Sequence, residues 1–179
     1  TYVWLGGTTT EDWDWRKELI PYLDKSVVYY DPCIRPGDGL DWDESARANE
    51  VKAKEHARCH VYVIASGMKG CFTIEEITEA VMSHKDVCVA VLDYDNKFTP
   101  EMKKSLNACM ERWEELGATS VNTLIAVARY VNDHKAHNSV VVSDASVTPR
   151  ITADFMRIKA SNANTPNWRE ISVRSSVPA

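Results

Sequence analysis

The chain has 179 residues, of which 44% are apolar and 26% are charged. This length and balance predict one soluble domain that buries its own core without metal or disulfide staples. The net charge of −5 at pH 7 makes a nucleic acid polymer an unexpected partner. No apolar run approaches the roughly 18 residues of a membrane-spanning helix, and the first residues lack a signal-peptide pattern. The five cysteines are an odd number and stand singly, which favours a reducing compartment, so we expect a cytoplasmic protein with no membrane contact.

The charge is distributed unevenly along the chain. Residues 1–147 carry 16 Lys and Arg against 24 Asp and Glu, a net charge of −8, whereas residues 148–179 carry 5 against 2, a net charge of +3. The last segment is rich in Ser, Asn, Thr and Pro and shows no sustained hydrophobic period. We therefore expect an α/β domain over residues 1–147 and an extended, irregular C-terminal arm over residues 148–179.

Short apolar runs typical of strands alternate along the chain with longer segments of helical period. The expected strands are 2–5, 27–30, 61–64, 87–92 and 139–143. The expected helices are 12–23, 44–58, 73–84, 99–117 and 120–133. Pro21 should distort the last turn of the first helix, and Thr99 followed by Pro100 is typical of a capped helix start. Because the connections are too long for hairpins, we predict a doubly wound parallel sheet of about five strands with helices on both faces, a Rossmann-like (flavodoxin-like) fold.

In such a sheet, ligands bind at the carboxyl ends of the strands. Three of the predicted strand ends carry unusual residues, namely Gly6-Gly7-Thr8, Tyr30-Asp31-Pro32 and the turn from Ser66 to Gly70. Glycine lets the backbone approach a ligand closely, and the helix N-terminus after Gly70 favours an anionic group. These features predict a nucleotide-sized ligand at this edge. Gly6 and Gly7 are equally useful in a plain turn, and the sequence holds neither a G-x-G-x-x-G fingerprint nor a phosphate loop.

Two acidic residues, Glu75 and Glu76, fall in the first turn of the helix predicted after this turn. A carboxylate at that place lies at the rim of the expected cleft and can act as a nucleophile or base. The alternative is helix capping, because Thr73-Ile74-Glu75-Glu76 fits the S/T-x-x-E pattern. Glu50 and Glu55 in the preceding helix are candidates for a second carboxylate, or they form a solvated helix face with Lys52 and Lys54.

Aromatic and metal-binding residue types give weaker indications. Trp13, Trp15 and Trp42 fall near the expected cleft edge, where they either stack a base or serve as core and surface residues. His134 and His137 have no third ligand type nearby, and the sequence lacks Cys-x-x-Cys and His-Glu-x-x-His motifs. We therefore expect no metal and no cofactor.

In order and spacing, several short segments resemble the nucleoside 2-deoxyribosyltransferase superfamily in its shorter, variant branch, over roughly residues 2–95. They are Tyr-Val-Trp-Leu-Gly-Gly-Thr (2–8), Trp-Arg-Lys-Glu-Leu-Ile-Pro-Tyr-Leu (15–23), Tyr-Tyr-Asp-Pro (29–32), Asp41-Trp42, the strand 61–64 and Met-Lys-Gly-Cys-Phe-Thr-Ile-Glu-Glu-Ile (68–77). The resemblance implies N-glycosyl transfer or hydrolysis on a 2′-deoxynucleoside or its 5′-monophosphate. It also implies a Rossmann-like sheet, a small-molecule nucleoside or nucleotide as partner, and a homo-oligomer.

The resemblance also implies roles for individual residues. Glu76 best matches the family's carboxylate nucleophile, which forms a covalent glycosyl-enzyme that a second base or water then captures. Asp31 or Asp41 would assist departure of the base. Lys69 and the amides around Gly70 would contact a 5′-phosphate. The residues expected to contact substrate are Trp4, Gly6, Gly7, Thr8, Asp41, Trp42, Glu50, Glu55, Met68, Lys69, Gly70 and Thr73.

Two positions depart from the family pattern, since Asp31 stands where Asn is usual and His60 where Asp is usual. These departures keep an alternative open. In that alternative the chain is a catalytically silent nucleotide-binding or structural domain, whose C-terminal arm docks on a partner or a neighbouring subunit.

Overall fold

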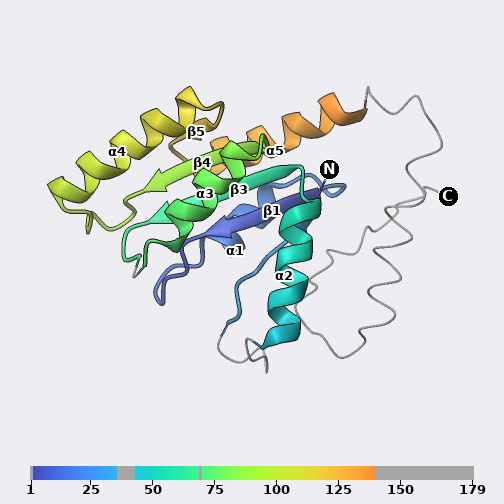
Figure 1. Ribbon diagram of the computed structural model, residues 1–179, viewed down its shortest axis with the longest axis horizontal. Helices are drawn as coiled ribbons and strands as arrows, with labels where there is room; N and C mark the ends of the chain where they lie inside the picture. The colour runs from blue at the N-terminus through green and yellow to red at the C-terminus, as the bar shows by residue number, and fades with distance from the viewer. Residues whose placement is uncertain (1, 36–42, 69, 140–179) are drawn as a thin grey trace.

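The computed structural model describes residues 2–35, 43–68 and 70–139, with side chains through residue 134. Five parallel strands form one sheet in the order β2-β1-β3-β4-β5 (Figure 1). The strands are β1 (Tyr2–Gly7), β2 (Val28–Tyr30), β3 (Cys59–Ala65), β4 (Asp86–Leu92) and β5 (Thr119–Val121). The helices are α1 (Trp15–Leu19) with the short 3-10 helix η1 (Ile20–Tyr22), α2 (Glu44–His56), α3 (Phe72–Met82), α4 (Pro100–Glu115) and α5 (Leu124–Ser139). This is the doubly wound, Rossmann-like α/β fold that the sequence predicts.

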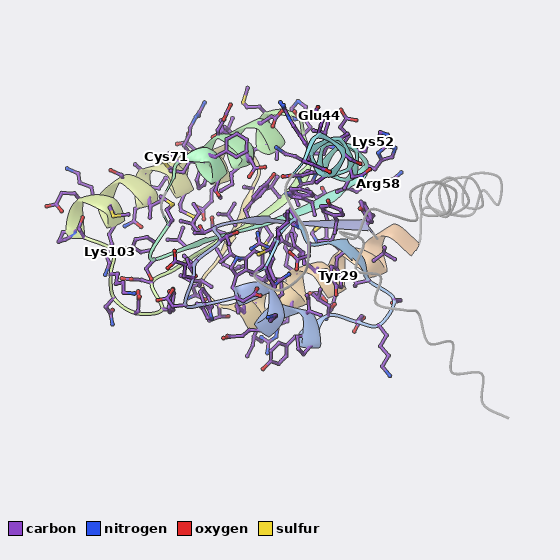
Figure 2. The ribbon with its side chains drawn as sticks, turned by 90° about the horizontal axis from the view of Figure 1, so that it is seen from below. Tyr29, Glu44, Lys52, Arg58, Cys71 and Lys103 are labelled. Atoms are coloured by element: carbon purple, nitrogen blue, oxygen red, sulfur yellow. The ribbon has the colours of Figure 1, made fainter. Side chains whose placement is uncertain are left out.

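Two helix layers enclose the sheet. Helices α2, α3 and α4 pack on one face and helices α1 and α5 on the other (Figure 2). Every residue of β3 is buried, and its side chains alternate between the layers, with Tyr62 and Ile64 toward α2–α4 and Val61 and Val63 toward α1 and α5. A strand buried on both faces carries an uninterrupted apolar run, which explains why the central strands are easy to recognise in the sequence.

The first four strands and the helices between them confirm the predicted order, and the predicted helix signals are in place. Thr99 Oγ1 accepts the N–H of Met102 at 3.2 Å, and Pro100 opens α4. Gly117, with a φ of +105°, follows the end of that helix. The first helix is shorter than predicted: Asp14 caps α1, and the chain continues past Leu19 as the 3-10 turn that contains Pro21.

The last part of the domain differs from the prediction. We expected a helix over residues 120–133 and a strand over residues 139–143; instead β5 occupies Thr119–Val121, and α5 runs from Leu124 to Ser139. The short β5 lies at the edge of the sheet and is only partly buried, so it lacks the apolar run that marks a central strand. Thr123 then caps α5, because its Oγ1 accepts the N–H of Ala126 at 3.1 Å. Residues 140–143 and the predicted arm over residues 148–179 lie outside the described residues.

Within the described ranges, no helix is both long enough and apolar enough to cross a membrane. All five cysteines are free thiols, and Cys59 and Cys88 are buried in the core.

A buried arginine joins the carboxyl ends of β1 and β2. Arg16, at the start of α1, donates to the carbonyl oxygens of Leu5, Gly7 and Thr8 at 2.9, 3.1 and 3.3 Å. Its Nε lies 3.4 Å from Oδ1 of Asp31, which follows β2. Asp31 also accepts from Arg35 at 2.7 Å and from the N–H of Cys33 at 2.9 Å. Asp31 thus neutralises the buried guanidinium and fixes the loop after β2.

We predict that Asp31→Ala destabilises the protein by about 3 kcal/mol, because it leaves a buried cation without its counter-charge. The matched control is Glu115→Ala, which removes the exposed partner of Arg112 and should cost about 0.5 kcal/mol or less. Urea unfolding of both variants measures the difference. Equal losses in the two variants would contradict the role assigned to the Arg16–Asp31 pair.

Candidate functional site

The acidic residue Glu76 lies on the buried side of α3. The helix begins at Phe72 with Cys71 at the N-cap position and no side-chain cap. Thr73 is therefore inside the first turn, and the capping-box interpretation of Thr73 and Glu76 is wrong. Glu76 shares with Ile77 and Ala80 the face of α3 that packs against the rest of the domain.

Glu76 is paired with a lysine from the neighbouring helix. Lys54 of α2 places its Nζ 3.2 Å from Oε1 of Glu76 and 2.9 Å from Oε2 of Glu79. Burial raises the pKa of Glu76, Lys54 works against that rise, and the negative charges of Glu50 and Glu79 add to it. The result is a carboxylate that is poorly solvated and held next to a single ammonium group.

Three aromatic rings lie in the same core cluster, from Trp4 and Tyr62 in the middle of β1 and β3 and from Tyr30 at the end of β2. Trp4 stacks on Tyr30 with ring centroids 5.4 Å apart and planes 8° apart. Gly6 is paired with Tyr62 on the next strand, and a Cβ at Gly6 would fall 2.4 Å from Tyr62 Cε1 and 2.5 Å from Trp4 Nε1. Only glycine at this position lets the two rings lie over the strand.

The hydroxyl group of Tyr62 donates its hydrogen bond to His60. His60 Nε2 lies 3.1 Å from the carbonyl oxygen of Ala57, which can only accept, so Nε2 carries the proton. Burial lowers the pKa of His60 to about 4, so the ring is neutral at pH 7 and Nδ1 accepts from the Tyr62 hydroxyl at 3.3 Å. The pKa of this phenol is raised, first by burial and then by the charge of Glu76. The indole N–H of Trp4 lies near the same oxygen and works against the rise in the pKa of Tyr62.

One buried hydrogen-bond donor on this side of the sheet, Nδ2 of Asn49, has no acceptor among the described residues. The indole N–H of Trp4 lies beside the Tyr62 hydroxyl. Asn49 lies on the side of α2 that also carries the buried Ala46 and Ala53, one turn before Ala53. An unpaired buried donor costs about 1–3 kcal/mol, so a ligand with acceptor oxygens or ring nitrogens would gain by occupying this region.

Part of the predicted site is brought together here. Trp4, Gly6 and Glu76 belong to this cluster, and Glu50 is close enough to influence the pKa values of both Glu76 and Tyr30. Met68 packs at the edge of the same core.

Other predicted residues lie elsewhere. Gly7 has a φ of +117° and fits against the backbone of Val63, and Thr8 Oγ1 accepts the N–H of Ala65 at 3.2 Å, so both join β1 to β3. Asp31 pairs with Arg16 and Arg35, and Arg35 pairs with Asp14 before α1, on the side of the sheet away from Glu76. The remaining described positions are Glu55 and Gly70, which are exposed, and Thr73, which is half-buried. Asp41, Trp42 and Lys69 lie outside the described residues.

Sequence reasoning missed the contributions of Lys54, Asn49 and Tyr62. Lys54 was grouped with an exposed helix face, yet it follows Glu50 by four residues on α2, a spacing that brings side chains together on one side. Tyr62 follows His60 by two residues in a strand, which places two polar rings on one face of an otherwise apolar sheet. Those two spacings were the available signals.

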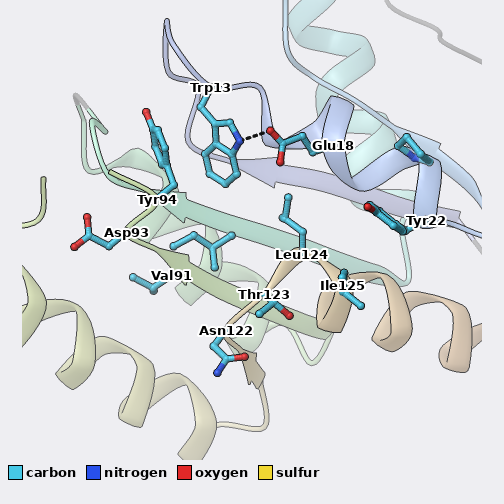
Figure 3. A pocket seen from close by; sticks show the side chains of 12 residues that line it. Trp13, Glu18, Tyr22, Val91, Asp93, Tyr94, Asn122, Thr123, Leu124 and Ile125 are labelled. Atoms are coloured by element: carbon cyan, nitrogen blue, oxygen red, sulfur yellow. Dashed lines mark hydrogen bonds between the residues drawn. The ribbon is translucent and has the colours of Figure 1, made fainter. Parts of the chain in front are cut away.

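A separate groove of about 830 Å³ lies beyond the carboxyl ends of β4 and β5, on the side of α1 and α5 (Figure 3). Trp13 lines it, stacks against Tyr94 with centroids 4.4 Å apart, and donates from Nε1 to Glu18 at 2.7 Å. None of its lining residues belongs to the Glu76 cluster. Trp15, by contrast, is a core residue whose Nε1 donates to the carbonyl of Thr8.

Within the described part of the chain, no three His, Cys, Asp or Glu residues gather in a way that could hold a metal ion. His134 Nδ1 lies 3.1 Å from the carbonyl oxygen of Tyr130, and its ring stacks on that tyrosine. The side chain of His137 lies outside the described residues.

Comparison with protein-family models finds no match, and comparison with curated proteins finds none either. Among solved structures, the chain is similar to a conserved protein from Enterococcus faecalis V583, with a TM-score of 0.51 and 14% identity. The similarity covers 75% of this chain and 98% of that one. The shared feature is the fold. At this identity, the likeness supports the α/β arrangement and carries no information about activity.

The burial of Glu76 predicts a pH-dependent effect on stability. Because the pKa of Glu76 is raised above 4.5 in the folded state, the stability it contributes is full below pH 4.5 and is lost as the pH rises through the raised pKa. Glu76→Gln should therefore raise the Tm at pH 7 and change it less at pH 4. Glu75→Gln, at the exposed neighbouring position, should leave the Tm unchanged at both pH values. Thermal unfolding followed by circular dichroism tests this, and a lower Tm for Glu76→Gln at pH 7 would contradict it.

Proposed function

We propose that the chain cleaves the N-glycosidic bond of a 2′-deoxynucleoside or its 5′-monophosphate, with Glu76 as the nucleophile. The observation that carries this proposal is the buried Glu76 carboxylate, held by Lys54 and close enough to Tyr62 of β3 to raise the pKa of that phenol. In the strand order of this sheet, β1 and β3 are adjacent and their following helices, α1 and α3, pack on opposite faces. Doubly wound sheets bind ligands outside the carboxyl ends of two such strands, which supports a site near this strand pair. The resemblance of residues 2–95 to the nucleoside 2-deoxyribosyltransferase superfamily supports the same assignment.

The chemistry proceeds in two displacements. An oxygen of Glu76 attacks C1′ of the sugar, the C1′–N bond breaks, and its electron pair moves to the base, which takes a proton from water. Water or a second base then attacks C1′, loses a proton and releases the Glu76 carboxylate. A negative oxygen in a poorly solvated place stabilises the oxocarbenium character of both transition states.

The surroundings of Glu76 suit a nucleoside. The flat Trp4–Tyr30 stack offers apolar ring surface, and the unpaired side-chain N–H of Asn49 is a donor for a hydroxyl oxygen or ring nitrogen. Asp31, which the resemblance implies as an aid to base departure, is instead occupied by two arginines away from Glu76. The proposal therefore takes the proton for the leaving base from water.

The proposal places the protein in the cytoplasm, with a small-molecule partner, as a homo-oligomer. The homo-oligomer is what the resemblance of residues 2–95 implies. Light scattering coupled to size-exclusion chromatography measures the assembly state, and a monomer at all concentrations would contradict this part of the proposal.

The decisive experiment is chromatography of free base released from a panel of deoxynucleosides and deoxynucleotides, with and without an acceptor base. We expect release by the unmodified protein and a decrease on the order of 10⁴-fold or more in Glu76→Gln, the scale seen when a covalent nucleophile is removed. Glu75→Gln, one residue away and exposed, should keep the original rate. Dependence on the acceptor base separates transfer from hydrolysis.

No release from any substrate by folded protein would overturn the proposal. Saturable nucleoside binding without release would then identify the silent nucleotide-binding domain, and the absence of both would favour the structural alternative. Equal activity in Glu76→Gln and the original chain would also refute the nucleophile assignment.

A further inference from the structure

Four charged side chains meet between α2 and α3. Glu50 and Lys54 are one turn apart on α2, and Glu76 and Glu79 are one turn apart on α3. The Lys54 ammonium binds both α3 carboxylates, at 3.2 Å from Glu76 and 2.9 Å from Glu79. An ammonium group has three N–H donors, so one lysine satisfies both contacts at once.

The three members of this bridge differ sharply in burial. The exposed fraction of the side chain is 9% for Glu76, 21% for Lys54 and 66% for Glu79. Water can replace Lys54 at the exposed Glu79, since surface ion pairs contribute little. Water cannot do so as readily at the buried Glu76, where an unpaired charge is costly. The lysine therefore matters most to Glu76, while Glu79 competes for it from the solvent side.

We propose that Lys54 is a positioning residue, which keeps Glu76 ionised and oriented in the free protein and shifts onto Glu79 when Glu76 becomes a glycosyl ester. The second half of this statement rests on the proposed function.

The shift follows from the charge balance of the reaction. When Glu76 Oε bonds to C1′ and the base leaves with the electron pair and a proton from water, the carboxylate becomes a neutral ester. Lys54 then loses its attraction to Glu76 but retains the Glu79 carboxylate, so its charge is not left unpaired. When water or a second base attacks C1′ and gives up a proton, the Glu76 carboxylate returns and the three-membered bridge forms again.

The groups that face Glu76 predict opposite effects for the two partners. They are Glu50 and Lys54 from α2, Glu79 from α3 and Tyr62 from β3. Removing the ammonium at position 54 should make Glu76 harder to ionise, whereas removing the charge of Glu79 should make it easier. Opposite shifts would measure the electrostatic coupling of both partners to Glu76, and a bridge without that coupling would leave the ionisation of Glu76 unchanged.

The test is an NMR titration of the Glu76 carboxyl carbon in protein labelled with carbon-13 at glutamate, assigned with Glu76→Gln. Lys54→Met should move the Glu76 midpoint up by about one pH unit or more, the size expected for a nearby opposite charge. Glu79→Gln should move it down by a smaller amount, and Lys54→Arg should restore it. Lys52→Met, at an exposed position of the same helix, is the matched control and should leave it unchanged.

The acid limb of the pH profile of kcat/KM for base release should shift in the same directions as the Glu76 midpoint.

Rapid-quench analysis should show less covalent intermediate in Glu79→Gln, because Lys54 then has no carboxylate on α3 to move to. Unchanged midpoints, or shifts of one sign in both variants, would overturn the inference whether or not the protein is active. The expected NMR shifts without base release would support the positioning role and refute the proposed function, so the two failures are distinguishable. Equal amounts of intermediate in Glu79→Gln and the original chain would overturn the shift onto Glu79.

Discussion

The architecture of the candidate site depends on one buried cation, the guanidinium of Arg16. It binds three carbonyl oxygens at the end of β1 and approaches the carboxylate that follows β2. Without such a donor, carbonyl groups at the end of a buried parallel strand would be desolvated and unpaired, which costs free energy comparable to a lost hydrogen bond. Arg16 therefore fixes the backbone of Gly6 and Gly7, and with it the place where the Trp4 and Tyr62 rings lie over the sheet.

Hydrophobic pattern was sufficient for most of the fold. The runs at β1, β3 and β4 are apolar because both faces of each strand are covered, and Thr99-Pro100 marks the start of α4 through local chemistry alone. The pattern failed at β5, because this three-residue edge strand, Thr-Ser-Val, is only partly buried. It therefore lacks the apolar run that would distinguish it from the start of the following helix. It also overextended the first helix, since the periodicity of Trp15, Leu19 and Leu23 continues through a 3-10 turn that Pro21 imposes.

The candidate site was less predictable than the fold, for a physical reason. The position of Glu76 could be singled out from its own helix, but its environment depends on which side chain α2 presents to α3, a long-range property. Lys54 has the same local sequence character as its exposed neighbour Lys52, and only packing makes it the partner of a buried carboxylate. The capping-box pattern at Thr73 failed for a similar reason, since Cys71 takes the N-cap position, the helix begins at Phe72, and Thr73 lies inside its first turn.

Buried polar groups are hydrogen-bonded more completely on one face of the sheet than on the other. On the α1 side, Arg16 and Asp31 have several partners each, and Trp15 Nε1 donates to a carbonyl. On the α2 and α3 side, Nδ2 of Asn49 has no acceptor among the described residues, and burial of Glu76 disfavours its ionised form. An unpaired buried donor and a poorly solvated carboxylate both lower stability. Groups of this kind are found in native proteins where they bind a ligand or take part in a reaction. That contrast supports the proposed site between α2, α3 and the aromatic rings of the sheet.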